Sequence, residues 1–298
     1  MRLRDPIYFM KTPSIPLLLS LLLAVTPPLA RGESSTTQTS HEVDPINFGW
    51  RFHQGSNPKA KEASFDDSNW KQVDLPHDWA IHGPFNPKGN PDTAKLPWRG
   101  EGWYRKTFTL PADAKGKRVQ FIFDGVMANP TVYLNGEEGG SWIYGYNSFW
   151  LDVTDAAKFG GENVLSVHVD TRQHASRWYP GAGIYRKVSM RLVDPVHLPV
   201  WGVFVTTPEV NDSQAKVRAE VEIANLSGSE KTVGVEAAII DPNGREIAMK
   251  RQSLKVGEEN NKAVLEFALG KPLRWDVDHP HLYSLRTRVV VDGSDVDH

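Results

Sequence analysis

Apolar and polar residues alternate with a period of two along much of this chain, and no long stretch outside its first thirty residues shows the longer period of an amphipathic helix. Because successive side chains of a strand point to opposite faces of a sheet, this alternation predicts β-strands. In the first half it predicts strands over residues 103–110, 119–123, 131–134 and 164–169. Asn135-Gly136 predicts a hairpin, because both residues tolerate a positive φ. Residues 151–155 are expected to begin a short helical turn.

The alternation resumes in the second half, after a short connector bounded by Pro195 and Pro199. It predicts strands over residues 217–223, 233–240, 264–269 and 282–291, with a turn at 241–244. Roughly seven short strands in about a hundred residues is the count of an immunoglobulin-like sandwich. The cysteines of antibody domains are absent, so the pattern predicts the sandwich architecture alone.

These patterns predict an all-β protein with two domains. We expect a jelly-roll β-sandwich over residues 46–194, a linker over 195–199 and an immunoglobulin-like β-sandwich over 200–298. Residues 31–45 begin with a stretch rich in Ser and Thr and are predicted to form a flexible leader. A chain of 298 residues is long enough for two such cores without disulfides or metals.

The first thirty residues have the pattern of a secretory signal peptide. Arg2, Arg4 and Lys11 precede an apolar run from Ile15 to Val25 that ends near small residues. The run is shorter than the roughly 20 residues that span a bilayer, and no second apolar stretch follows it. We therefore expect cleavage near residue 30, no membrane span, and a periplasmic or extracellular location.

The charge of the chain argues against a nucleic-acid partner. The formal net charge is −2, and it becomes −4 once the predicted signal peptide is removed, because that segment carries three basic residues and one acidic residue. No basic patch for a phosphate backbone is expected. The sequence leaves the oligomeric state open, with a homo-oligomer among the alternatives.

The segment from Ser176 to Arg186, SRWYPGAGIYR, combines the features of a ligand-binding corner. A proline followed by Gly181 and Gly183 predicts a tight bend where the backbone passes close to a neighbour. Trp178 and Tyr179 enter this bend, and their flat apolar faces beside Arg177 suit a sugar ring.

Ten short motifs, in order along the chain, resemble glycoside hydrolase family 2, the β-galactosidase and β-glucuronidase group. In the first domain they are INFGWRF at Ile46, FDDSNW at Phe65, LPHDW at Leu75, GWYRKTF at Gly102, VYLNG at Val132, FWLDVTD at Phe149, GENVLSVHVD at Gly161 and GIYR at Gly183. In the second domain they are VWGVFVTTP at Val200 and WDVDHPHLYSL at Trp275. The resemblance implies a parent protein that hydrolyses terminal β-glycosidic bonds.

In this family a third domain, a TIM barrel of about 250 residues, carries the two catalytic glutamates. This sequence ends at His298, where the barrel would be about to start, so we expect no catalytic residue in this chain and no hydrolysis by it alone. The barrel of the same polypeptide is therefore an expected partner, beside the carbohydrate substrate. No cofactor is expected. No metal site is expected either, because Pro280 separates His279 from His281 and spoils a shared geometry.

The resemblance also implies a contribution to substrate binding. In the family's β-galactosidases a polar residue before the tryptophan of the PxxW loop reaches the sugar, and Asp78 holds that place. Many members carry an acid six residues before the glycine of the GI[FY]R motif, but here that position is Arg177. Galactose or glucuronate specificity therefore does not carry over, although an arginine can bind sugar hydroxyls or an anionic group. Asp78, Arg177 and Trp178 are our candidate substrate-binding residues.

Several alternatives remain at this point. Asp78 and its neighbours would also serve to cap a loop and plug the end of a sandwich, and Arg177 with Trp178 would also suit a corner between domains. The whole chain would also suit a free-standing carbohydrate-binding protein or a cell-surface adhesion module. We expect no folded closing element at residues 296–298, which favours a fragment of a glycosidase over the free-standing protein.

Overall fold

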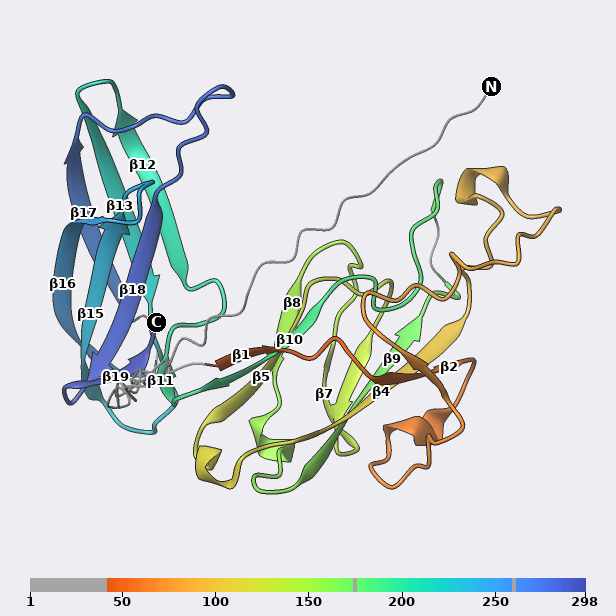
Figure 1. The fold of residues 1–298 in the computed structure, drawn as a ribbon. Helices are drawn as coiled ribbons and strands as arrows, with labels where there is room; N and C mark the ends of the chain where they lie inside the picture. The colour runs from red at the N-terminus through yellow and green to blue at the C-terminus, as the bar shows by residue number, and fades with distance from the viewer. Residues whose placement is uncertain (1–41, 174–175, 259–260) are drawn as a thin grey trace, which may run out of the picture. The chain divides into compact units, whose positions relative to one another are not determined.

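The computed structural model describes residues 42–173, 176–258 and 261–298 (Figure 1). Strands dominate these ranges, and the helical elements within them are short 3₁₀ turns: η1 (Pro58–Lys61), η2 (Pro91–Thr93), η3 (Ala112–Ala114) and η4 (Thr154–Ala156). Two separate clusters of buried apolar residues lie in the first and second halves of the chain. The predicted all-β class with two sandwiches is therefore confirmed.

The first sandwich consists of two antiparallel sheets with a jelly-roll arrangement. A four-stranded sheet has the order β1 (Glu42–Pro45), β10 (Val188–Val193), β5 (Arg118–Phe123) and β8 (Phe149–Asp152). A six-stranded sheet has the order β3 (Lys71–Val73), β2 (Trp50–Gln54), β4 (Glu101–Thr109), β9 (Glu162–Asp170), β6 (Thr131–Leu134) and β7 (Glu137–Ser141). The predicted hairpin joins β6 to β7, with a positive φ at both Asn135 and Gly136.

Large aromatic rings fill the core between these two sheets. Phe123 stacks on Phe149 with ring centroids 4.9 Å apart, and the edge of Phe121 meets Phe108 at 5.7 Å. Trp50 is fully buried and donates its indole N–H to the carbonyl of Ile46 at 2.6 Å. Burial of such rings is the main source of stability in a core of this type.

A buried arginine fixes an irregular segment, residues 57–67, over the outer face of the six-stranded sheet. Arg105, on β4, is 2% exposed and donates to the carboxylate of Asp67 at 2.7 Å and to the carbonyl of Phe65 at 3.2 Å. The same guanidinium donates to the carbonyls of Ala60 and Glu62. A charge this deeply buried is tolerated because its donors all have partners. The alternation of apolar and polar residues along β4 did not indicate that residues 57–67 would cover its polar face.

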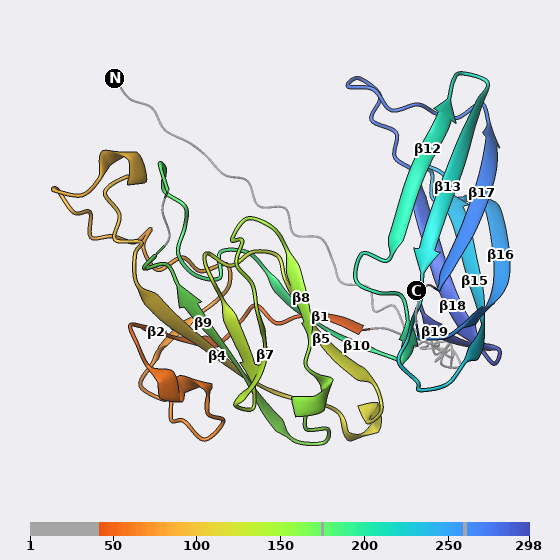
Figure 2. The same cartoon turned by 180° about the vertical axis from the view of Figure 1, so that it is seen from behind.

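The second sandwich has a smaller and more regular pair of sheets (Figure 2). One sheet has the order β12 (Val203–Val210), β13 (Gln214–Glu222) and β17 (Lys262–Gly270), and the other has the order β16 (Glu246–Val256), β15 (Lys231–Ile240), β18 (Ser284–Val291) and β19 (Ser294–Asp297). Its core is built mainly from valine, alanine and leucine, and along β17 exposed and buried residues alternate without exception.

Two boundaries differ from those expected. Residues 42–45, which were expected to belong to the flexible leader, pair with β10 as strand β1. The expected linker is not free, because Val196 and Leu198 are buried in the second core and β11 (Val196–His197) pairs with β14 (Ala224–Asn225). The predicted signal peptide and the rest of the leader, to residue 41, lie outside the described residues.

The end of the second sandwich also differs from expectation. Residues 294–297 form β19, which pairs with β18, so a folded closing element is present and the expectation of its absence is wrong. The hairpin forms because the turn residues Asp292 and Gly293 both have a positive φ. The argument from the chain end, which favoured a fragment over a free-standing binding protein, therefore no longer applies.

Candidate functional site

Two segments far apart in sequence run side by side and build the candidate site. The amide of His77 donates to the carbonyl of Ile184 at 2.8 Å, and the amide of Trp79 donates to the carbonyl of Ala182 at 3.0 Å. Gly183 has a φ of +118°, and a Cβ at this position would overlap the Tyr104 hydroxyl and lie 2.9 Å from the His77 carbonyl oxygen. Only glycine fits here, so the predicted close backbone approach is confirmed.

This pairing brings Asp78 against Tyr179. The Tyr179 hydroxyl donates to the carboxylate, with distances of 2.6 and 2.7 Å to its two oxygens, and the amide of Ala80 donates to the same group at 3.0 Å. Partial burial, followed by the hydrogen bond to Asp78 and the charge of Asp78, raises the pKa of Tyr179 well above its usual range. The hydroxyl therefore remains protonated and holds the half-buried carboxylate in one orientation.

Trp178 presents an open aromatic face beside this pair. Its side chain is 60% exposed, and its indole N–H donates to the Tyr146 hydroxyl at 3.0 Å. Tyr146 belongs to the loop between β7 and β8, and the same loop is fixed where Tyr185 donates to the carbonyl of Gly145 at 2.7 Å. An indole held by its N–H while its face stays open can stack on a sugar ring.

The three predicted site residues therefore have different surroundings. Asp78 has ordered partners, Trp178 is held in place but open, and Arg177 is exposed. No hydrogen bond or ion pair joins Arg177 to Asp78 within the described residues, so the two are not brought together as one polar cluster. Their role in substrate binding stays a prediction.

Sequence reasoning did not include Tyr179 or Tyr146 among the site residues. Tyr179 lies next to Trp178 in the glycine-rich corner, and its link to Asp78 spans 101 residues. Tyr146 lies in the run Trp142–Tyr146, where aromatic side chains surround a glycine between two strands. This run of aromatic residues between two strands is the sequence feature that could have indicated Tyr146 as a site residue.

The residues on either side of Asp78 face the core rather than Tyr179. His77 is 8% exposed, its Nδ1 lies 2.8 Å from the Tyr104 hydroxyl, and its ring packs 4.7 Å from that of Phe52. Burial lowers the pKa of His77 to about 4, helped by the positive charges of Lys71 and His82 and opposed by Asp78. His77 is therefore neutral at neutral pH.

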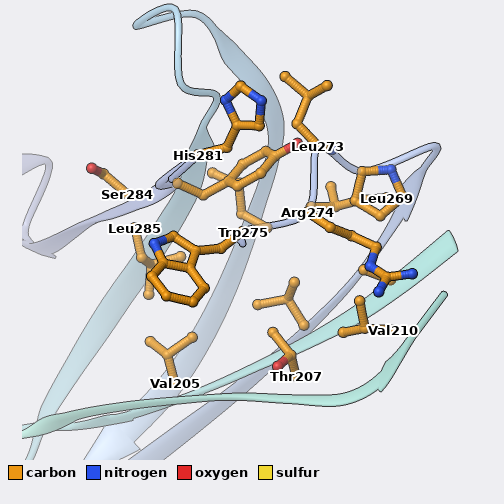
Figure 3. A pocket seen from close by; sticks show the side chains of 15 residues that line it. Val205, Thr207, Val210, Leu269, Leu273, Arg274, Trp275, His281, Ser284 and Leu285 are labelled. Carbon is orange, nitrogen blue, oxygen red and sulfur yellow. Dashed lines mark hydrogen bonds between the residues drawn. The ribbon is translucent and has the colours of Figure 1, made fainter. Parts of the chain in front are cut away.

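A second hollow lies in the second sandwich and has a different chemistry. Its volume is about 380 Å³, and its walls come mainly from apolar side chains of β12, β13, β17 and the segment before β18. Figure 3 shows Val205, Leu273 and Trp275 around this hollow. Trp275 is 60% exposed, and Leu273 is 46% exposed. A surface of this kind favours contact with another apolar surface over binding of a hydrophilic sugar.

The described residues hold no group of three or more His, Cys, Asp or Glu side chains that could bind a metal ion. His279 lies near Asp276, with Nδ1 3.2 Å from Oδ1, and its ring centroid lies 6.3 Å from that of His281. No helix in the described ranges has the length and apolar content that crossing a bilayer demands.

Two sequence profiles match the two sandwiches. The profile described as glycosyl hydrolase 2 galactose-binding domain-like matches residues 50–180, and the profile of glycosyl hydrolases family 2 matches residues 197–298. The chain belongs to glycosyl hydrolases family 2. The two matches cover the open aromatic corner as far as Pro180 and nearly all of the second sandwich.

Relatives within family 2 include enzymes named for two different sugars. The chain is 41% identical over 265 residues to the β-galactosidase BoGH2A of Bacteroides ovatus, a match that covers 86% of this chain and 31% of the relative. It is 29% identical over 278 residues to a putative β-glucuronidase of Formosa agariphila, covering 93% of this chain and 26% of that protein. The chain thus spans about a third or less of the length of these relatives.

Solved structures of family 2 proteins have the same fold over most of this chain. A member from Bacteroides cellulosilyticus superposes with a TM-score of 0.78 at 34% identity, covering 86% of this chain and 35% of that one. A family 2 β-glucuronidase superposes with a TM-score of 0.81 at 26% identity, covering 88% of this chain and 30% of that one. The resemblance predicted from the ten motifs is therefore confirmed.

Proposed function

We propose that this chain is the N-terminal part of a secreted family 2 glycosidase of the β-galactosidase type. In this proposal the two sandwiches help to frame a site for terminal β-linked sugars, and a catalytic barrel in the same polypeptide supplies the two glutamates. The chain by itself contributes substrate contacts and no catalytic residue.

The observation that carries this proposal is the pairing of Asp78 with Tyr179 beside the open face of Trp178. A carboxylate fixed by two donors is preorganised to accept hydrogen bonds from sugar hydroxyls through its remaining lone pairs. An aromatic face at 60% exposure can cover the apolar side of a pyranose ring. Arg177, which is exposed next to Trp178, supplies donors to hydroxyls at the rim.

The apolar hollow of the second sandwich supports the proposed barrel as a partner. Val205 and Val210 on β12 are 43% and 48% exposed, and Trp275 lies at the same hollow. Monomeric proteins rarely leave such apolar groups gathered on one face. The relatives are about three times as long as the matched region, which supplies the length for a barrel to cover this face.

Secretion is part of the proposal and rests on the sequence of the first thirty residues. Three basic residues followed by an apolar run are typical of a signal peptide that is removed on export. The test is to express the chain in a bacterium, fractionate the cells, and measure the mass of the product. A product that stays in the cytoplasm with its first thirty residues intact would contradict secretion.

The decisive experiment is a chimera. Residues 42–298 of this chain replace the matching segment of the Bacteroides ovatus β-galactosidase, and hydrolysis of a chromogenic β-galactoside is measured. We expect an active chimera, and we expect Trp178→Ala and Asp78→Asn to lower kcat/KM by about tenfold or more, a loss of roughly 1.4 kcal/mol or more in transition-state binding. Trp201→Ala, which removes a similarly exposed tryptophan (64%) outside the Asp78 corner, is the matched control and should change kcat/KM less than about twofold.

The other outcomes separate the alternatives. A folded but inactive chimera, together with β-galactoside binding by the chain alone, would contradict the framing role and favour a carbohydrate-binding protein. An active chimera that is unaffected by Trp178→Ala and Asp78→Asn would keep the family role and remove these two residues from the site.

A further inference from the structure

A third hollow, on the first sandwich, is lined by polar and aromatic side chains and is used by neither the Asp78 corner nor the apolar face of the second sandwich. It has a volume of about 440 Å³, within the range of small-ligand pockets. It lies at the edge of the six-stranded sheet, where the end of β2 and the start of β3 meet residues 77–83. Its lining residues are Phe52, His53, Gln54, Asn69, Trp70, Lys71, His77, Trp79, His82 and Gly83.

The aromatic groups of this cleft are arranged in two stacked pairs. His53 stacks on Trp70 with centroids 5.2 Å apart and planes inclined by 26°. Phe52 stacks on Trp79 at 6.0 Å with an angle of 17°. Trp70 is only partly buried, so part of its surface remains available to a ligand. Flat rings of this kind are the usual packing surface for the apolar face of a sugar.

One polar nitrogen in the lining lacks a partner among the described residues. The indole N–H of Trp79 is buried without an acceptor, and Trp79 itself is 6% exposed. His77, beside it, uses Nδ1 toward Tyr104. A buried donor without an acceptor costs about 1–3 kcal/mol, so a ligand or water that supplies one is favoured.

The ionisable side chains that line the cleft are all basic. Lys71 and His82 are exposed at the rim, and no aspartate or glutamate is among the residues that line it. Asp78 points away, toward Tyr179, where its carboxylate is already bonded. The cleft therefore presents hydrogen-bond donors and a positive rim around aromatic surfaces, which suits a negatively charged ligand with a ring.

We propose that this cleft is a binding site for an anionic saccharide, a sugar ring bearing a sulfate or carboxylate group. The ring packs against Trp70, and the anionic group lies toward Lys71 and His82. His77 and Trp79 bond the hydroxyls. The residues that line this cleft do not include Asp78, Tyr179 or Trp178, so the proposal does not depend on the proposed glycosidase role.

The test uses the full chain and isothermal titration calorimetry with three probes: galactose 6-sulfate, glucuronate and galactose. We expect both anionic sugars to bind more tightly than galactose by about tenfold, equivalent to roughly 1.4 kcal/mol. Whichever anionic sugar binds more tightly identifies the preferred group. Lys71→Gln should remove the advantage of the anionic sugars, and Trp70→Ala should weaken binding of all three.

Controls keep the test decisive. Lys115→Gln removes an exposed lysine from another part of the first sandwich and should leave binding unchanged. Trp178→Ala should also leave it unchanged, since that residue belongs to the Asp78 corner. Lys71 and His82 are exposed, so their variants should fold even if Trp70→Ala does not. Circular dichroism checks the fold of each variant.

Three results would overturn the proposal. The first is that none of the probes binds to the folded chain at millimolar concentration. The second is equal binding of galactose and the anionic sugars. The third is binding that persists in Lys71→Gln and His82→Ala but disappears in Trp178→Ala. An inactive chimera would leave this proposal untouched, so the two proposals fail separately.

Discussion

The two sandwiches of this chain fill the cores between their sheets with different kinds of residue. The first has a core of aromatic rings, and buried polar groups such as Arg105 and His77 fix its long irregular segments. The second has a core of valine, alanine and leucine between strands that mostly alternate. The polar and aromatic cleft beside Trp70 lies on the first, whereas the apolar hollow lies on the second, which also has a smaller polar hollow lined by residues such as Asp212 and Asp276. Irregular segments held by buried polar groups provide sites for polar ligands, whereas a regular sandwich provides a surface for another domain.

The largest effect is expected where two segments of the first sandwich touch most closely. Gly183→Ala forces a Cβ into the Tyr104 hydroxyl and the His77 carbonyl at a φ of +118°, so we expect the free energy of unfolding to fall by about 4 kcal/mol. Urea unfolding followed by tryptophan fluorescence measures it. Gly161→Ala is the control, because a Cβ there meets nothing within 4 Å. Equal stability of the two variants would contradict the tight crossing.

A slightly smaller effect is expected at the buried arginine. Arg105→Met removes the guanidinium that donates to Asp67 and to the carbonyls of residues 60, 62 and 65, which should cost about 3 kcal/mol and release residues 57–67 to protease. Arg251→Met, on the second sandwich, removes a 65% exposed guanidinium paired with Glu236 and should cost less than about 1 kcal/mol. Similar losses at both positions would remove the contrast between the two sandwiches.

Acid should weaken the first sandwich through His77. Its pKa is about 4 in the folded chain and near 6.5 when unfolded, so the unfolded state takes up the proton first as the pH falls. Stability from this group is complete above pH 6.5 and is lost toward pH 4, by about 3 kcal/mol. His168 and His197 also have lowered pKa values, so the test compares the wild type with His77→Gln. An unchanged slope of stability against pH in this variant would contradict the prediction.

The smallest effect is expected at the candidate site. Tyr179→Phe removes the hydroxyl that donates to Asp78, which should lower the free energy of unfolding by about 1 kcal/mol. Tyr283→Phe, at the rim of the apolar hollow, removes a bond from the exposed amide of Leu273 and should cost about half as much. Thermal unfolding compares the two. A larger loss of unfolding free energy in Tyr283→Phe than in Tyr179→Phe would contradict this prediction.

Strands were predicted best from the sequence where one face of the strand is buried and the other is exposed to solvent. The strands over 217–223 and 264–269 were confirmed as β13 and β17 for this reason. Strand β16 was not predicted, because only Val256 of its eleven residues is buried and its alternation is weak. The buried state of Arg105 was also beyond the pattern, since its partners lie about 40 residues away and their positions depend on tertiary packing.

The candidate site was predicted only in part, for a related reason. The corner at Ser176–Arg186 carries its own turn residues, so its bend could be expected from local chemistry. The partner of Asp78 could not, because nothing near LPHDW indicates which of the chain's tyrosines reaches it. The cleft of His77 and Trp79 was missed because the segment was considered only as a sugar contact through Asp78 or as a loop cap, whereas a strand-like segment presents two faces.

The bond between Asp78 and Tyr179 has a consequence for how the protein is made. Its two ends are 101 residues apart, so the corner cannot exist until most of the first sandwich has left the ribosome. Closing a loop of this length also has an entropic cost that is recovered only once the strands between the two residues have paired. The carboxylate is therefore expected to become ordered late in folding, after the sheets that surround it.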